Sequence, residues 1–294
     1  MEEIRLTLNG HATRLLRTGA EGPACLFLHG FPEHGGAWAE VFGHLAGVRA
    51  WAPDQRGYGT AWRPAEVEPY AVGKLVRDVL QMVTLLGLER VHLVGHDWGA
   101  SVAYGVAFTQ DPRIASLTIL NGVHPIPFQR ALAAGGPQTV ASQYIPWLRR
   151  PGSETILAAD GGAKLAALFA EGMDMAWLDA ARLDTYRAAW GGEAGIGAMV
   201  NWYRASPLVV PSPPRALSPD EIPDWPAGRM RVHVPHLLIW GAGDRALLPE
   251  STHGLEDHCD DLHRVEIPGT DHWLHHQKPA EVARLIGDFV RGIG

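Results

Sequence analysis

The sequence is poor in cysteine, in long apolar runs and in clustered positive charge. Its 294 residues include only two cysteines, Cys25 and Cys259, which cannot form a disulfide framework. No apolar stretch approaches the roughly 18 residues that a membrane-spanning helix needs. The 25 lysines and arginines against 32 acidic residues give a net charge of −7, whereas phosphate backbones and anionic lipids bind clustered cations. We therefore expect neither a nucleic-acid nor a membrane partner.

The first residues, Met1-Glu2-Glu3-Ile4-Arg5, also lack the basic-then-apolar order of a secretion signal, so a cytoplasmic location is expected. Hydrophobic residues make up 46% of the chain and charged residues 19%, which is typical of a globular protein. At about 150 residues per domain, this length corresponds to roughly two units, or to one core that carries a large insertion. The sequence leaves open whether the chain forms a homo-oligomer.

Short apolar runs alternate with helical patterns over the first 120 residues. The runs Cys25–Leu28 and Val91–Val94 are apolar almost throughout, as in strands that are covered on both faces. Val72–Leu86 and Ala280–Val290 carry apolar residues at helical spacing. The pattern predicts an α/β fold, with a mostly parallel eight-stranded sheet and helices on both of its faces. The predicted strands span residues 3–8, 13–18, 24–29, 49–53, 91–95, 114–120, 234–240 and 262–267.

The segment from His124 to Arg231 is alanine-rich, helical in pattern and without a convincing strand. It ends in a stretch with seven prolines between Pro207 and Pro226, which excludes a helix or a central strand there. We interpret this segment as a helical cap, or lid, that is inserted into the α/β core. The predicted organisation is a core formed by residues 1–123 and 232–294, with the cap at residues 124–231 between its two parts.

A sharp turn between a strand and a helix is predicted at Gly95-His96-Asp97-Trp98-Gly99, with the helix beginning near Ala100. This is the spacing of a nucleophile elbow, in which small flanking residues allow a strained turn to present the central side chain. Asp97 stands where esterases have serine. Because no Gly-x-Ser-x-Gly occurs at this elbow, we do not expect a serine-type esterase.

Two later turns complete a predicted catalytic triad. Asp244 and His272 follow two late strands, so that nucleophile, acid and base come in the order Asp97, Asp244, His272. The loop after an earlier strand has the sequence His-Gly-Phe-Pro. The backbone N–H groups of Phe31 in that loop and of Trp98 after the nucleophile are predicted to form an oxyanion hole.

Four segments together resemble the α/β-hydrolase-fold epoxide hydrolases, and the resemblance extends from about residue 3 to residue 290. The segments are His-Gly-Phe-Pro-Glu (29–33), Asp-Gln-Arg-Gly-Tyr-Gly (54–59), Val-Gly-His-Asp-Trp-Gly-Ala (94–100) and His272-Trp273.

The resemblance implies two lid tyrosines that hold the epoxide oxygen. Tyr203 matches one of them, within the sequence Asn-Trp-Tyr-Arg, and Tyr144 matches the other, seven residues before a Pro-Gly pair. Because Trp202 is next to Tyr203 in the sequence, it is predicted to contact the substrate, as are Phe31 and Trp98.

These residues suit a two-step hydrolysis. A carboxylate is ionised at neutral pH, so Asp97 needs no base before it attacks an epoxide carbon to form an ester. Tyr144 and Tyr203 would donate to the departing alkoxide, and His272, oriented by Asp244, would activate water against the ester. The expected partners are a small apolar epoxide and water, the product is a vicinal diol, and no metal or cofactor is required.

Two alternatives remain open at the level of sequence. A haloalkane or haloacetate dehalogenase of the same fold also uses an aspartate nucleophile, and the Trp98 indole could donate to a halide. The two tyrosines favour the epoxide hydrolase over the dehalogenase. By resemblance, fluoroacetate-type dehalogenases have a histidine at the position of Tyr144. A ligand receptor without catalysis, built on the same fold, is the second alternative. His275 and His276 are expected on a helix surface.

Overall fold

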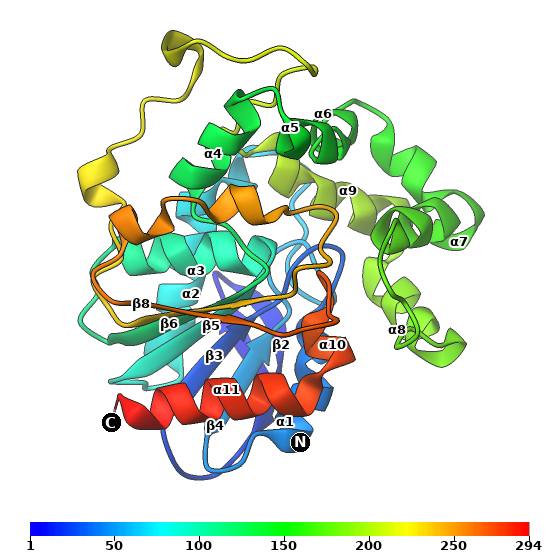
Figure 1. Cartoon of the computed structure of the whole chain (residues 1–294). Coiled ribbons are helices and arrows are strands. Elements are labelled where there is room, and N and C mark those ends of the chain that lie inside the picture. Colours follow the sequence, from blue (N-terminus) through cyan, green and yellow to red (C-terminus); the bar gives the residue numbers. More distant parts are fainter. Residues whose placement is uncertain (294) are drawn as a thin grey trace.

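The computed structural model describes residues 1–293 and has one eight-stranded sheet at its centre (Figure 1). The strand order is β1-β2-β4-β3-β5-β6-β7-β8. Strand β2 pairs antiparallel with both β1 and β4, and all other neighbours are parallel. The strands are β1 (Glu2–Leu8), β2 (His11–Thr18), β3 (Ala24–Leu28), β4 (Arg49–Pro53), β5 (Val91–His96), β6 (Ile114–Leu120), β7 (His236–Trp240) and β8 (Leu262–Glu266).

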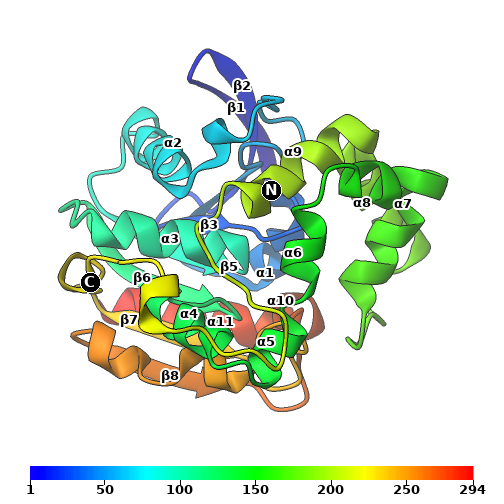
Figure 2. The same cartoon turned by 90° about the horizontal axis from the view of Figure 1, so that it is seen from above.

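The burial of the strands follows their position in the sheet. Every residue of β3, β5 and β7 is buried, as expected for parallel strands that helices cover on both faces. In the edge strand β8 three of the five residues are exposed and two are half-buried. At the opposite edge the β1–β2 hairpin projects from the sheet (Figure 2). The α/β fold and the eight strands predicted from the sequence are confirmed, with boundaries that differ by at most two residues.

Helices cover the two faces of the sheet because alternate strand residues point to opposite sides. On one face, α1 (Ala39–His44) and α11 (Pro279–Gly292) pack against residues such as Phe27 and Val94. On the other face, α2 (Val72–Leu85) and α3 (Trp98–Phe108) pack against residues such as Leu26 and Leu93. Helix α3 begins at Trp98, two residues before the predicted start, so it follows Asp97 directly.

Six further helices lie between β6 and β7 in the chain, and Figure 1 shows α7 and α8 at the outer side of the molecule. Helix α7 contains a break in which Asp160, Gly161 and Gly162 have positive φ angles. Residues 205–235 return to the sheet without a strand or an α-helix. The six helices are α4 (Pro125–Ala133), α5 (Pro137–Ala141), α6 (Tyr144–Leu148), α7 (Ser153–Ala170), α8 (Ala180–Trp190) and α9 (Gly192–Arg204).

Among the helices of residues 1–293, none combines the length and the apolar character that crossing a membrane requires.

Candidate active site

Asp97 sits in a strained turn between β5 and α3, with φ 49° and ψ −117°. A non-glycine residue rarely adopts a positive φ, and such residues concentrate at functional sites. The turn fits only because its flanking residues lack a β-carbon. A β-carbon on Gly99 would lie 2.1 Å from the Leu28 carbonyl oxygen, and one on Gly95 would lie 2.7 Å from the Gly99 oxygen. The small residues that define the predicted elbow are therefore sterically required.

The loop after β3 lies against the Asp97 side chain. A β-carbon on Gly30 would come within 2.5 Å of the Asp97 β-carbon, so glycine permits this approach. The next residue, Phe31, donates its backbone N–H to Asp97 Oδ1 at 2.8 Å. Trp98 opens α3, and the first N–H groups of a helix have no partner within the helix. Phe31 thus donates to the Asp97 carboxylate, and Trp98 follows Asp97 directly in the chain.

His272 lies between two carboxylates. Its Nδ1 is 2.7 Å from Asp244 Oδ2, and its Nε2 is 3.8 Å from Asp97 Oδ2. The second Asp244 oxygen accepts the backbone N–H groups of Ala246 and Leu247, at 2.8 and 2.9 Å. The structure therefore brings together three residues that are up to 175 positions apart in the sequence, in the arrangement of a nucleophile, a base and an orienting acid.

Burial and neighbouring charges shift the pKa values of His272 and Asp244 in opposite directions. Burial alone would lower the pKa of His272, but the Asp244 and Asp97 carboxylates outweigh it and raise the pKa to about 9. Burial likewise opposes ionisation of Asp244, yet the His272 charge and the hydrogen bonds to its oxygens hold the pKa of Asp244 below its ordinary value. With this pKa, the His272 imidazole is protonated at neutral pH and hydrogen-bonded to Asp244.

Tyr144 and Tyr203 come from α6 and α9 and face each other, with ring centroids 6.0 Å apart. Tyr203 also packs edge-on against Phe31 and Trp98, at 5.1 and 5.0 Å. Burial, followed by nearby acidic groups including Asp97, raises the pKa of both phenols. Both hydroxyls are therefore protonated over the physiological pH range and available as donors.

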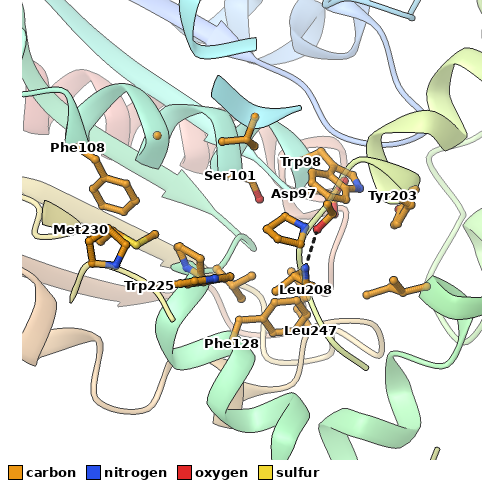
Figure 3. A pocket seen from close by; sticks show the side chains of 18 of the residues that line it. Asp97, Trp98, Ser101, Phe108, Phe128, Tyr203, Leu208, Trp225, Met230 and Leu247 are labelled. Carbon is orange, nitrogen blue, oxygen red and sulfur yellow. Dashed lines mark hydrogen bonds between the residues drawn. The ribbon is translucent and has the colours of Figure 1, made fainter. Parts of the chain in front are cut away.

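Two cavities meet at Asp97. The first, of about 510 Å³, is lined by Trp98 and largely by apolar side chains (Figure 3). The second, of about 420 Å³, is lined by Phe31 and His272. Asp97, Tyr144 and Tyr203 border both cavities. A molecule held at the carboxylate can therefore extend in two directions.

Trp202 packs beside the site and outside the two cavity linings. Among residues 1–293, the lining of neither cavity includes Trp202. Its indole N–H donates to the Arg56 carbonyl at 2.9 Å, and its ring packs against Trp98 and Tyr58. Adjacent residues on a helix point in different directions, and of these two only Tyr203 lines the cavities, so the substrate contact of Trp202 stays a prediction.

The model of the alpha/beta hydrolase fold family matches residues 23–279. The chain belongs to this family. Over 96% of its length this α/β-hydrolase is 31% identical to the AB hydrolase superfamily protein YfhM of Bacillus subtilis, covering 96% of that protein. It is 28% identical to epoxide hydrolase A of Mycobacterium tuberculosis, over 97% of this chain and 96% of that protein.

A solved structure of an epoxide hydrolase from metagenomes of hot environments superposes on this α/β-hydrolase with a TM-score of 0.86. The two chains are 32% identical, and the match covers 99% of this chain and 98% of that one. Together with the family match, these relatives make the protein a hydrolase.

Behind His272, the α/β-hydrolase contains a buried polar cluster that the sequence analysis missed. Glu33 Oε1 lies 3.1 Å from His275 Nε2 and 2.9 Å from His276 Nε2, and it accepts the Tyr186 hydroxyl at 3.1 Å. Its Oε2 lies 3.0 Å from His96 Nδ1. The expected exposure of His275 and His276 is wrong: both are buried, since α10 (Leu274–Gln277) packs against α1.

Three of these side chains, Glu33, His275 and His276, form the one group in residues 1–293 with the spacing of metal ligands. Histidines that bind a metal usually donate their second ring N–H to a partner. The Nδ1 atoms of both histidines have no hydrogen-bond partner among the described residues. The donor set therefore fits a hydrogen-bonded cluster around a carboxylate better than a metal centre.

Asn121 is a second residue that the sequence analysis missed. It lies at the carboxyl end of β6, where its side-chain amide donates to Asp244 Oδ2 at 2.8 Å and to the Gly241 carbonyl at 3.1 Å. Its side-chain oxygen accepts the Gly241 N–H at 2.7 Å. The sequence offered one signal for this contact: Asn121 follows β6 directly. The carboxyl ends of neighbouring parallel strands meet at one edge of the sheet, so a polar residue there can reach the residues that follow β7.

Proposed function

We propose that this hydrolase opens epoxides to vicinal diols through a covalent ester on Asp97. The observation that carries the proposal is the Asp97 carboxylate at the junction of two cavities that Tyr144 and Tyr203 also line, 3.8 Å from the base His272. The names of the relatives in Mycobacterium tuberculosis and in the hot-environment metagenomes support the same activity.

The first step opens the ring. One Asp97 oxygen attacks an epoxide carbon, the carbon–oxygen bond of the ring breaks, and the electron pair moves to the epoxide oxygen. Tyr144 and Tyr203 donate hydrogen bonds to this developing alkoxide, in a buried site where such donors act most strongly. The proton that completes the alcohol comes from the protonated His272, which borders the same cavity as the tyrosines.

Ring opening also prepares His272 for the second step. The Asp97 charge is one of the causes that raise the pKa of His272. The ester removes that charge, which lowers the pKa and favours the neutral imidazole. His272 is then a general base at neutral pH, and Asp244 holds the ring in place through Nδ1.

The second step hydrolyses the ester. Neutral His272 takes a proton from a water molecule, whose oxygen attacks the ester carbonyl. The N–H groups of Phe31 and Trp98 stabilise the oxyanion. On its collapse the acyl–oxygen bond to the alkyl group breaks and the leaving oxygen takes the proton of the added hydroxyl, so that the diol departs and Asp97 is again a carboxylate. The proton balance closes, because His272 gives up one proton in the first step and regains one in the second. We further propose that residues 124–231 act as a cap that holds both tyrosines over Asp97.

The substitution His272→Gln tests this scheme directly. Incubated with styrene oxide, the variant should open the ring slowly and accumulate an ester, seen by intact mass as an addition equal to one epoxide. The double variant His272→Gln with Asp97→Asn is the matched control and should show no addition. Multiple-turnover activity in His272→Gln without any adduct would contradict the two-step scheme.

A substrate comparison separates this activity from the alternatives. The unmodified protein should form diol from styrene oxide and release no halide from fluoroacetate or a chloroalkane. A single turnover in heavy-oxygen water should place the isotope in the peptide that contains Asp97. Halide release without diol would indicate a dehalogenase, and no turnover of any of these substrates would favour a ligand receptor.

A further inference from the structure

The last turn of α9 carries two neighbouring aromatic side chains that point to different parts of the molecule. Tyr203 borders both cavities at Asp97, whereas Trp202 contacts the loop after β4. Both side chains are almost fully buried, at 3% and 1% exposure. Because the two residues belong to the same helical turn, a shift of Trp202 moves the backbone that carries Tyr203.

The Trp202 indole links this turn to the sheet side of the molecule. Its N–H donates to the Arg56 carbonyl at 2.9 Å. The next residue of that loop, Gly57, lies against α9, where an added β-carbon would be 3.1 Å from the Ala198 carbonyl oxygen. Loop and helix are thus in close backbone contact, and the indole hydrogen bond fixes how the end of α9 sits on the loop.

The Arg56 carbonyl is itself firmly held. The Arg56 guanidinium donates through Nε and Nη2 to the two carboxylate oxygens of Asp78 in α2, at 2.8 and 2.6 Å. Its Nη1 donates to the Pro69 carbonyl at 2.6 Å, and Asp78 also accepts the Asn9 side-chain amide at 2.6 Å. A buried bidentate pair has one preferred geometry. The residue that accepts the Trp202 hydrogen bond is therefore a fixed anchor.

The position of the Tyr203 hydroxyl matters most when the epoxide ring opens. A donor stabilises a developing alkoxide only from the correct distance and direction, and a displacement of about 1 Å can cost about 100-fold in rate. The edge-on contacts of Tyr203 with Phe31 and Trp98 fill space around its ring. The Trp202 hydrogen bond adds a directional constraint on the backbone of the same turn.

Resting on the proposed epoxide hydrolase activity, we infer that Trp202 is a positioning residue for ring opening. Its indole N–H, anchored on the Arg56 carbonyl, holds the last turn of α9 so that the Tyr203 hydroxyl meets the developing alkoxide. The ion pair between Arg56 and Asp78 supports this anchor. Hydrolysis of the ester uses the base and the oxyanion-hole N–H groups, so it does not depend on this contact.

Removal of the indole N–H tests the inference. With styrene oxide in single-turnover kinetics, Trp202→Phe should slow ring opening by about 10-fold and leave ester hydrolysis within about 2-fold, as followed by mass detection of the ester. Replacement of Trp202 by 3-benzothienylalanine keeps the ring size and exchanges the N–H for sulfur. This second variant should give the same result, and it keeps the test decisive if Trp202→Phe does not fold.

A double-variant comparison shows whether Trp202 acts through Tyr203. In the Tyr203→Phe protein the hydroxyl is already absent, so adding Trp202→Phe should change the ring-opening rate by less than about 2-fold. A further slowing of about 10-fold in the double variant would mean that the two effects are independent. That result would overturn the inference, because Trp202 would then act on the substrate or on the fold as a whole.

Trp190→Phe is the matched control. The Trp190 indole, 1% exposed at the end of α8, donates to the Pro32 carbonyl at 2.8 Å, so this change removes the same kind of hydrogen bond. The Pro32 loop is also held by the Glu33 N–H, which donates to the Gly30 carbonyl at 3.0 Å. Ring opening should therefore stay within about 2-fold of normal. Equal slowing in Trp190→Phe and Trp202→Phe would assign the effect to a general loosening and contradict the inference.

The same measurements separate this inference from the proposed function. If the unmodified protein forms neither ester nor diol from styrene oxide, the proposed function itself fails. If the unmodified protein forms both, but the Trp202 variants open the ring at the normal rate or slow both steps equally, only the positioning role is refuted. Urea unfolding of each variant verifies that the rates belong to folded protein.

Discussion

Tyr203 and Tyr58 are both buried tyrosines near Asp97, but their hydroxyls meet different surroundings. The Tyr203 side chain borders both cavities. The Tyr58 hydroxyl is buried without a hydrogen-bond partner among the described residues, and its ring packs against Trp202 and His29. The pair therefore offers a comparison of the same chemical change in two settings.

We expect Tyr203→Phe to slow ring opening by about 100-fold, because one donor to the developing alkoxide is lost. Hydrolysis of the ester should proceed at close to the normal rate, because in the proposed scheme its oxyanion is stabilised by the N–H groups of Phe31 and Trp98 and not by Tyr203. Tyr58→Phe should leave both rates unchanged, since its hydroxyl makes no hydrogen bond. Single-turnover kinetics with mass detection of the ester separates the two steps. Equal slowing of both steps in Tyr203→Phe would argue against its role.

At the level of elements, the elbow depends on close contact between the start of α3 and the end of β3. Gly99 is in the first turn of α3, where a β-carbon would lie 2.1 Å from the backbone oxygen of Leu28. A backbone atom in a buried strand cannot move aside as a flexible side chain can. The position of Asp97 is thus tied to the packing of this helix against the sheet.

Gly99→Ala should therefore destabilise the protein by more than about 3 kcal/mol and lower its soluble yield. Gly43→Ala is the matched control, because Gly43 is exposed in α1 and an added β-carbon there meets nothing within 4 Å. This second change should be neutral or stabilise by about 0.5–1 kcal/mol. Urea unfolding of the two variants makes the comparison, and equal stabilities would contradict the steric requirement.

For the whole molecule, the buried histidines control how stability depends on pH. Burial lowers the pKa of His34 and His92 to about 4, and of His124 and His236 to about 3. Below pH 6.5 the unfolded chain binds protons at these rings while the native protein does not, so stability falls as the pH drops.

His272 acts in the opposite sense. The pKa of His272 is about 9 in the native state, above its value in the unfolded chain. Its contribution to the free energy of unfolding is therefore complete below about pH 6.5 and is lost as the pH rises toward 9. We therefore expect a stability maximum near pH 7, with a fall on the order of 9 kcal/mol by pH 4.5 and a smaller fall by pH 9. Urea midpoints between pH 4.5 and 9 measure this curve. His272→Gln should flatten its alkaline side alone, and a curve without an acid slope would contradict the argument.

Much of the architecture was predictable because its signals are local. The apolar runs predicted the central strands such as β3 and β5, since burial on both faces leaves a continuous apolar sequence. The glycine spacing around Asp97 predicted the sharp turn, since only glycine fits beside a strained backbone. The cap boundaries and the catalytic roles remain predictions.

The sequence by itself determined the strands, the elbow and the order of Asp97, Asp244 and His272, because backbone angles and strand periodicity depend on neighbouring residues. Only the tertiary structure decided that His275 and His276 turn inward to Glu33, that Asn121 supports Asp244, and that Trp202 lies outside the cavities. It alone also decided that one cavity at Asp97 is lined by Ser101, Gly105 and Phe108 of α3. These features depend on which faces of distant elements pack together, and that choice is made by the shape and burial of the whole fold rather than by local sequence.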